Sequence, residues 1–212
     1  SNALEIPALQ LHSTLALRED GVPLGLLHLK IWSRDPEERG KKKTRRQRPI
    51  EQKESFKWIE GIRGARAAFG EAKPPAMLFV FDREGDVYEA LAEILSTADR
   101  AVIRQEYDRR VAAQDEEECF ARQRVHAQAP LGLRPIEVPR RPGRAARPAQ
   151  LTLRAGSVVL NPARQRLPLA LNLVEAVEEN PPPGQEPLHW ALWTTEPVAT
   201  LDQEMGDAYP EL

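Results

Sequence analysis

The sequence predicts an α/β fold to which a mainly β-stranded unit is attached, and three observations lead to this prediction. Residues 9–32 have the pattern of a β-hairpin, and residues 76–104 have that of a strand, a helix and a second strand. Residues 150–195 contain further short apolar segments separated by Gly, Pro and Asn, which is typical of successive β-strands.

The hairpin is predicted from alternation and from its turn. In residues 9–17, leucines recur at every second position except Ser13, which places them on one face of a strand. Residues 18–21 end in Asp-Gly, a pair that favours a tight turn. Residues 22–32 are nearly all apolar, so we expect the returning strand to be buried on both faces.

Residues 51–69 form the first predicted helix, because apolar side chains recur there at three- and four-residue spacing before Gly70. Residues 76–81 are continuously apolar and predict a central strand buried on both faces. Asp86 and Glu89 resemble a capping box that opens a second helix. A right-handed crossover through this helix would make the strands 76–81 and 100–104 parallel.

The composition changes after residue 104. Five prolines between Pro130 and Pro148 argue against regular structure there. Four strands are expected beyond it, at residues 150–154, 157–160, 167–177 and 188–195. The predicted division is therefore an α/β layer at 4–104, a β-rich insertion at 105–195 and a tail at 196–212.

Composition and charge exclude several classes of protein. The 30 Lys and Arg residues nearly balance the 32 Asp and Glu residues, so the net charge of −2 demands no nucleic-acid partner. Cys119 is the only cysteine, which excludes a disulfide scaffold and a cysteine-rich zinc site. No apolar run approaches the roughly 18 residues of a membrane helix, and no secretory signal is evident, so we expect a cytoplasmic protein without a membrane partner.

One segment is strongly basic. Residues 41–48 carry six positive charges and no acid. Such a block is typical of a solvated loop, although it can also contact phosphate groups. Both interpretations remain open, because a solvated basic loop can become ordered on a polyanion.

Asp82 is the sharpest candidate for a functional residue. It follows the apolar run 76–81, and functional groups in open α/β sheets lie at the carboxyl ends of strands. The alternative is a turn aspartate that caps the next helix. His12, His28, His126 and His189 are scattered, and each is interpreted as a strand or surface residue rather than a ligand or base.

Beyond this point the sequence resembles a known family. Residues 79–86 (FVFDREGD) resemble the second-aspartate motif of the bacterial cut-and-paste DDE transposases of the insertion-sequence-four family. Residues 25–32 (GLLHLKIW) and 53–58 (KESFKW) are similar to the strand and helix before that motif. Residues 180–190 (NPPPGQEPLHW) and 194–198 (TTEPV) are similar to the family's return from its β insertion.

This resemblance implies an RNase H-like fold interrupted by a β insertion, and a DNA transposase that uses two Mg²⁺ or Mn²⁺ ions. It implies that Asp82 is the middle carboxylate of an Asp-Asp-Glu triad and a metal ligand. It also implies that Arg104 contacts DNA and that a flipped thymine stacks on Trp190. Without the resemblance, ordinary strand packing is the expected role of Trp190. The implied partners are double-stranded transposon-end DNA and a second copy in a homodimeric complex.

The resemblance also leaves gaps. The family's first aspartate and last glutamate find no match, so we expect a fragment of the catalytic core that does not cleave DNA alone. The strand that would carry the first aspartate lies centrally in the family's sheet. We therefore expect the hairpin 9–32 to pair with the strand 77–81, or another copy of the chain to fill the gap.

Two other functions remain open. A non-catalytic DNA-binding or regulatory remnant would use residues 41–48 and 134–154, the latter with six Arg and one Glu, or +5. A structural interaction module would keep both basic segments as solvated loops.

Overall fold

The chain folds as a mixed α/β protein with a mixed sheet and few helices. The computed structural model describes residues 9–33, 48–72, 74–97, 99–111, 119–142, 145–160 and 167–198. Two compact units are present, the first comprising Ser1–Ala76 with Val87–Glu93 and the second Met77–Asp86 with Ile94–Leu212. In the described ranges, no helix has the length and apolar character that a membrane crossing needs.

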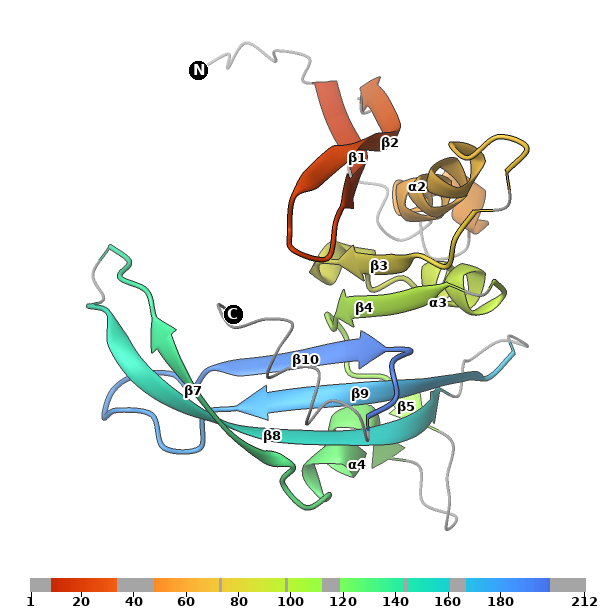
Figure 1. Cartoon of the computed structure of the whole chain (residues 1–212). Coiled ribbons are helices and arrows are strands. Elements are labelled where there is room, and N and C mark those ends of the chain that lie inside the picture. The colour runs from red at the N-terminus through yellow and green to blue at the C-terminus, as the bar shows by residue number, and fades with distance from the viewer. Residues whose placement is uncertain are drawn as a thin grey trace, which may run out of the picture. The chain divides into compact units, whose positions relative to one another are not determined.

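The first unit is a two-stranded hairpin with helices. Strands β1 (Leu9–Leu17) and β2 (Pro23–Ser33) pair antiparallel, as predicted, around a turn with Gly21 at φ 81° (Figure 1). A short 3₁₀ helix, η2 (Ile50–Gln52), precedes α2 (Phe56–Ala67). Most of α3 (Tyr88–Leu95) also belongs to this unit, up to Glu93.

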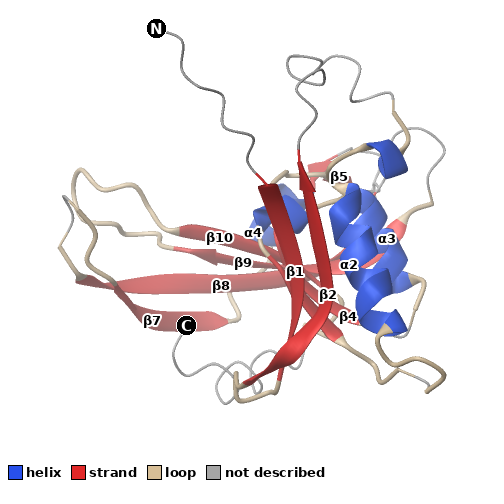
Figure 2. Ribbon diagram, turned by 90° about the horizontal axis from the view of Figure 1, so that it is seen from above, coloured by secondary structure: helices blue, strands red, loops and turns tan. Residues whose placement is uncertain are grey.

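Helix α2 packs against one face of the hairpin, and Figure 2 shows it running alongside β2. The predicted apolar stripe of the helix is confirmed, since Ile59, Ile62 and Ala65 are buried. The approach is close, because a Cβ at Gly61 would lie 2.8 Å from Thr14 Oγ1. At Gly64 a Cβ would lie 2.3 Å from His28 Cδ2. Glycines on α2 therefore permit the contact between helix and hairpin.

We predict that Gly64→Ala destabilises the protein, although alanine is the better helix former by about 1 kcal/mol. The new methyl group would also lie 2.9 Å from His28 Cβ, which a rotamer change cannot move away. Overpacking of this kind costs about 1–3 kcal/mol, so we expect a net loss of up to about 2 kcal/mol. Urea denaturation followed by tryptophan fluorescence measures it. Gly132→Ala is the control, because nothing lies within 4 Å of a Cβ there; equal stability of the two variants would contradict the prediction.

The opposite face of the hairpin is exposed, which corrects the expectation that residues 22–32 are buried on both faces. Leu26 is 60% exposed and Ile31 is 57% exposed. The physical reason is that β1 and β2 form a separate two-stranded sheet, and α2 packs against the other face, where His12, Thr14 and His28 lie. An apolar run alone does not reveal whether a second layer exists.

The second unit contains an eight-stranded sheet. Its elements are β3 (Leu78–Phe81), η3 (Arg83–Gly85), β4 (Arg100–Arg104), β5 (Arg110–Val111), β6 (Cys119–Phe120), α4 (Ala121–His126), β7 (Gly132–Val138), β8 (Arg147–Leu160), β9 (Leu169–Val177) and β10 (His189–Thr194). The strand order is β3-β4-β10-β9-β8-β5-β6, and β7 also pairs with β8 (Figure 1). Its buried core includes Ile103, Leu173 and Trp193.

The strand–helix–strand prediction is confirmed, because β3 and β4 are parallel with Phe81 opposite Ile103. The prediction of a central position for β3 is wrong, however. In the described part of the chain β3 pairs with β4 alone and lies at the edge of the sheet, with Val80 64% exposed. The prediction that the hairpin pairs with the strand 77–81 is also wrong for the described residues, because β1 and β2 pair only with each other there.

The β-rich region differs from prediction in two places. Strand β7 lies inside the proline-rich segment that we expected to be irregular. The segments 150–154 and 157–160 belong to one long strand, β8. Prolines are tolerated because β7 pairs only with β8 in the described residues and Pro148 is the second residue of β8.

The predicted division at residue 104 remains a prediction, although β4 and β10, which lie on either side of it in the sequence, pair in one sheet. The basic block 41–48, apart from Arg48, and most of the tail 196–212 fall outside the described residues.

Candidate functional site

Asp82 lies where the sequence predicted it, directly after the last residue of β3, and it is exposed. Both interpretations of this residue describe part of its geometry. Its Oδ1 accepts a hydrogen bond of 3.0 Å from the backbone N–H of Glu84, which makes Asp82 the N-cap of η3. The carboxylate is therefore a cap and also a solvent-accessible group at the carboxyl end of a strand.

Arg104 is the last residue of β4, the strand beside β3. Because Phe81 is opposite Ile103, continuing this parallel register by one residue brings Asp82 beside Arg104. The backbone of Asp82 is still extended, with φ −75° and ψ −171°. A carboxylate and a guanidinium group thus occupy adjacent positions at one rim of the sheet.

Trp190 belongs to β10, which pairs with β4 on the edge opposite to β3. Leu192 of β10 is opposite Arg104, and directly opposite residues point to the same face of a sheet. Trp190 is two residues from Leu192 and therefore shares this face. It is 36% exposed, so its indole is only partly packed. The register thus brings the three predicted site residues to one face of the sheet.

The described residues by themselves do not form the implied site for Mg²⁺ or Mn²⁺. Such ions prefer several oxygen ligands in octahedral geometry. Among the residues that the structure describes, no three His, Cys, Asp or Glu side chains gather closely enough to hold a metal ion. Asp82 offers one carboxylate, and one of its oxygens already accepts a backbone hydrogen bond.

Asp86 holds the loop that follows β4, and this role was missed in the sequence. Its side chain is fully buried, and Oδ2 accepts hydrogen bonds from the backbone N–H groups of Glu106 (2.9 Å) and Tyr107 (3.0 Å). Arg109 forms an ion pair with Oδ1. The expected capping box with Glu89 is therefore wrong, because both oxygens of Asp86 serve a loop distant in sequence. This network fixes the backbone just beyond Asp82 and Arg104.

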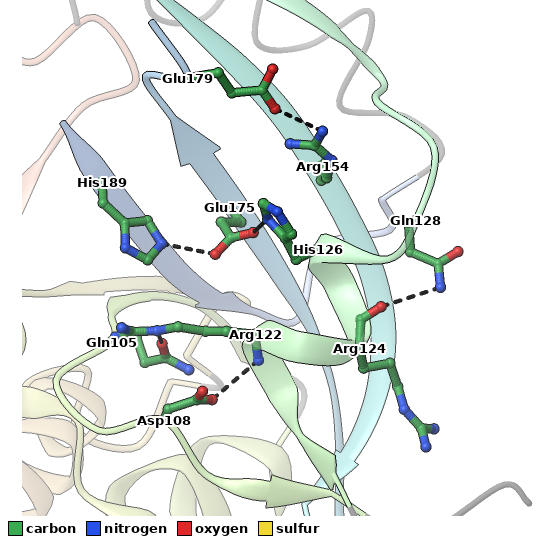
Figure 3. Close-up of polar contacts among 10 residues, drawn as sticks. All are labelled: Gln105, Asp108, Arg122, Arg124, His126, Gln128, Arg154, Glu175, Glu179 and His189. Carbon is green, nitrogen blue, oxygen red and sulfur yellow. Dashed lines mark hydrogen bonds and ion pairs between the residues drawn. The ribbon is translucent and has the colours of Figure 1, made fainter. Parts of the chain in front are cut away.

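A second polar cluster centres on Glu175 of β9, and Figure 3 shows this side chain between two imidazole rings. Oε1 lies 2.8 Å from Nε2 of His189, on β10, and Oε2 lies 3.2 Å from Nδ1 of His126, on α4. Glu175 is 3% exposed. The interpretation of these histidines as strand or surface residues omitted the carboxylate that joins them. They link α4, β9 and β10.

The basic stretch 134–154 is partly neutralised. Arg147 pairs with both carboxylate oxygens of Glu178 and donates to Gln185 Oε1 at 2.8 Å. Arg154 lies 2.8 Å from Glu179, and this hydrogen bond lowers the pKa of the Glu179 carboxyl below its usual value. Two of the six arginines thus serve internal ion pairs, which weakens the hypothesis that the whole stretch binds DNA.

No protein-family model matches the chain. The arrangement of Asp82, Arg104 and Trp190 is therefore the principal guide to function. The sequence pointed to Asp82 because it follows an apolar strand, and the family resemblance pointed to all three residues. Asp86 and Glu175 gave no such signal, because their partners are remote in sequence and no local pattern marks them.

Proposed function

We propose that this chain is part of the catalytic core of a cut-and-paste DNA transposase with an RNase H-like fold. The full-length parent would cleave transposon ends and join them to target DNA. The single observation that supports this most is the strand register. Continued by one residue beyond Phe81 and Ile103, it brings the exposed Asp82, the half-buried Arg104 and the partly exposed Trp190 to one face at the rim of the sheet.

The proposal assigns DNA contacts to two of these residues. Arg104 has the charge and the planar donors that suit a phosphate group. The partly exposed indole of Trp190 offers a surface on which an extruded base stacks, an interaction worth about 1–3 kcal/mol per base. No step is assigned to a metal ion, because the described residues do not gather a ligand set. We expect this chain to bind DNA without cutting it, because Asp82 is the only carboxylate of the implied Asp-Asp-Glu triad that finds a match in the sequence.

Trp190→Ala tests the stacking contact. We expect its affinity for a DNA duplex carrying an unpaired thymine to fall about 5- to 150-fold, which corresponds to the loss of about 1–3 kcal/mol. Fluorescence anisotropy of labelled DNA measures the affinity. Leu133→Ala, an exposed apolar residue on β7, is the control and should leave binding unchanged. Equal binding by the wild-type protein and Trp190→Ala would contradict the assignment.

A non-catalytic DNA-binding remnant is the second candidate, and the hydrogen bond from Glu84 N–H to Asp82 favours it. If Asp82 serves only as the N-cap of η3, its carboxylate has a structural role and no catalytic one. Incubation of the protein with supercoiled plasmid and Mg²⁺ separates the candidates further. Nicking by the wild-type protein that Asp82→Ala abolishes would assign catalysis to this chain and overturn the expectation that it only binds.

A further inference from the structure

The exposed face of the β1–β2 hairpin is an unusual surface. Six large apolar side chains occupy it and are 46–73% exposed; they are Leu9, Leu11, Leu15, Leu26, Leu29 and Ile31, and we name this surface the leucine face. The register brings them together, because Leu11 is opposite Ile31 and Leu15 is opposite Leu26. Ser13, opposite Leu29, lies at its centre. The leucine face has no charged member.

The leucine face cannot be the side on which the hairpin meets its own helix. The other face already packs against α2, where His12 and Trp58 rings meet edge to face at 4.7 Å. Lys30, on that same face, forms an ion pair with Glu60 of α2. The hairpin is thus a two-sided element with one side covered and the other exposed. Contiguous apolar patches above a few hundred Å² mark interaction sites in soluble proteins.

We propose that the leucine face binds the leucine face of a second copy of this chain. Stable interfaces bury about 800 Å² on each partner and have an apolar centre, and the six Leu and Ile side chains of the leucine face, which are 46–73% exposed, would supply such a centre. The absence of charge on the face means that bringing two copies together incurs no like-charge repulsion.

Symmetry and sheet geometry favour this occupant. A two-fold dimer uses the same patch on both partners, so one apolar face suffices. Two sheets pack face to face about 10 Å apart with alternate side chains between them, and the leucine face presents such alternate positions on both strands. Helix α2 covers only one side of each hairpin, and the dimer would place the other, apolar side of each hairpin against a second sheet.

Sedimentation velocity of the full chain tests the proposal. The protein concentration is varied over about 1–100 µM, a range that covers dissociation constants typical of weak dimers. We expect a concentration-dependent dimer, and at least a tenfold weaker dimer constant in the double variant Leu11→Asp, Leu29→Asp. Leu133→Asp is the matched control, because Leu133 is 60% exposed on β7 and lies outside the leucine face. Its dimer constant should equal that of the wild-type protein.

A second measurement guards against a variant that does not fold. In a Cys119→Ser background, Ser13→Cys places a thiol at the centre of the leucine face, and a short bismaleimide should join two copies. The same reaction with Leu133→Cys in the Cys119→Ser background should give little cross-linked product. Three results would each overturn the proposal. The wild-type protein could stay monomeric over the whole concentration range, the double variant could retain the dimer, or a monomeric protein could bind phospholipid vesicles through this face.

Discussion

Replacing Asp86 with alanine should cost about 3–5 kcal/mol of unfolding free energy, the loss typical of breaking a buried ion pair. The change removes the acceptor of two backbone N–H groups, those of Glu106 and Tyr107, and leaves the partly buried Arg109 guanidinium without its carboxylate. Because the loop after β4 then loses its anchor, DNA binding through Arg104 should weaken as well. Chemical denaturation followed by circular dichroism measures the stability.

Asp86→Asn is the informative companion variant. It keeps one oxygen that can accept from the two backbone N–H groups, but it removes the charge that pairs with Arg109. We expect an intermediate loss of about 1–3 kcal/mol. Asp20→Asn, in the exposed turn of the hairpin, is the control and should change stability little. If Asp86→Ala were as stable as this control, the anchoring role would be wrong.

Replacing Glu175 with alanine should destabilise the protein by about 1–3 kcal/mol, because hydrogen bonds to a charged group are lost inside the fold. The loss is smaller than at Asp86, since the side chains of His126 and His189 are 59% and 36% exposed and water can reach them. The same denaturation experiment measures it.

A double-mutant cycle shows whether the effect comes from the two imidazole contacts. The double variant His126→Ala, His189→Ala should lose most of the stability that Glu175→Ala loses, and adding Glu175→Ala to it should then change little. Strictly additive losses would mean that Glu175 stabilises the fold by some other contact.

The sequence predicted the local elements well because alternation and helical spacing report directly on backbone conformation. The hairpin, α2, and the parallel pair β3 and β4 follow from such patterns. The rim position of Asp82 followed from the same reasoning, since a residue after a strand must lie at its end. These features depend on neighbours in the chain.

The layers around each strand could not be predicted in this way. The apolar runs at β2 and β3 suggested burial on both faces, but Ile31 and Val80 are exposed. An apolar run records that a strand has apolar sides and does not record whether another element covers them. The prolines at 130–148 led us to expect irregular structure where β7 forms, for a related reason. A proline lacks a backbone N–H donor, and how much this destabilises a strand depends on whether the strand lies at the edge of a sheet.

The polar networks were also beyond sequence reasoning. Asp86 meets residues about 20 positions away, and Glu175 meets His126 49 positions away. No spacing rule connects such residues, because the sheet topology brings them together. The capping-box pattern at Asp86 shows how a local motif can match while the side chain binds elsewhere.

The salt dependence of DNA binding tests the central claim most directly, namely that the rim carrying Asp82, Arg104 and Trp190 contacts DNA. Arg100 is the control, because it lies at the opposite end of β4 from Arg104. The two residues are four positions apart in the strand and therefore share one face of the sheet. Each phosphate contact contributes about −0.9 to the slope of log affinity against log salt concentration. Arg104→Ala should therefore reduce the magnitude of the slope by about one, and Arg100→Ala should leave it unchanged. Equal slopes for Arg104→Ala and the wild-type protein, or a slope reduced only by Arg100→Ala, would contradict the account.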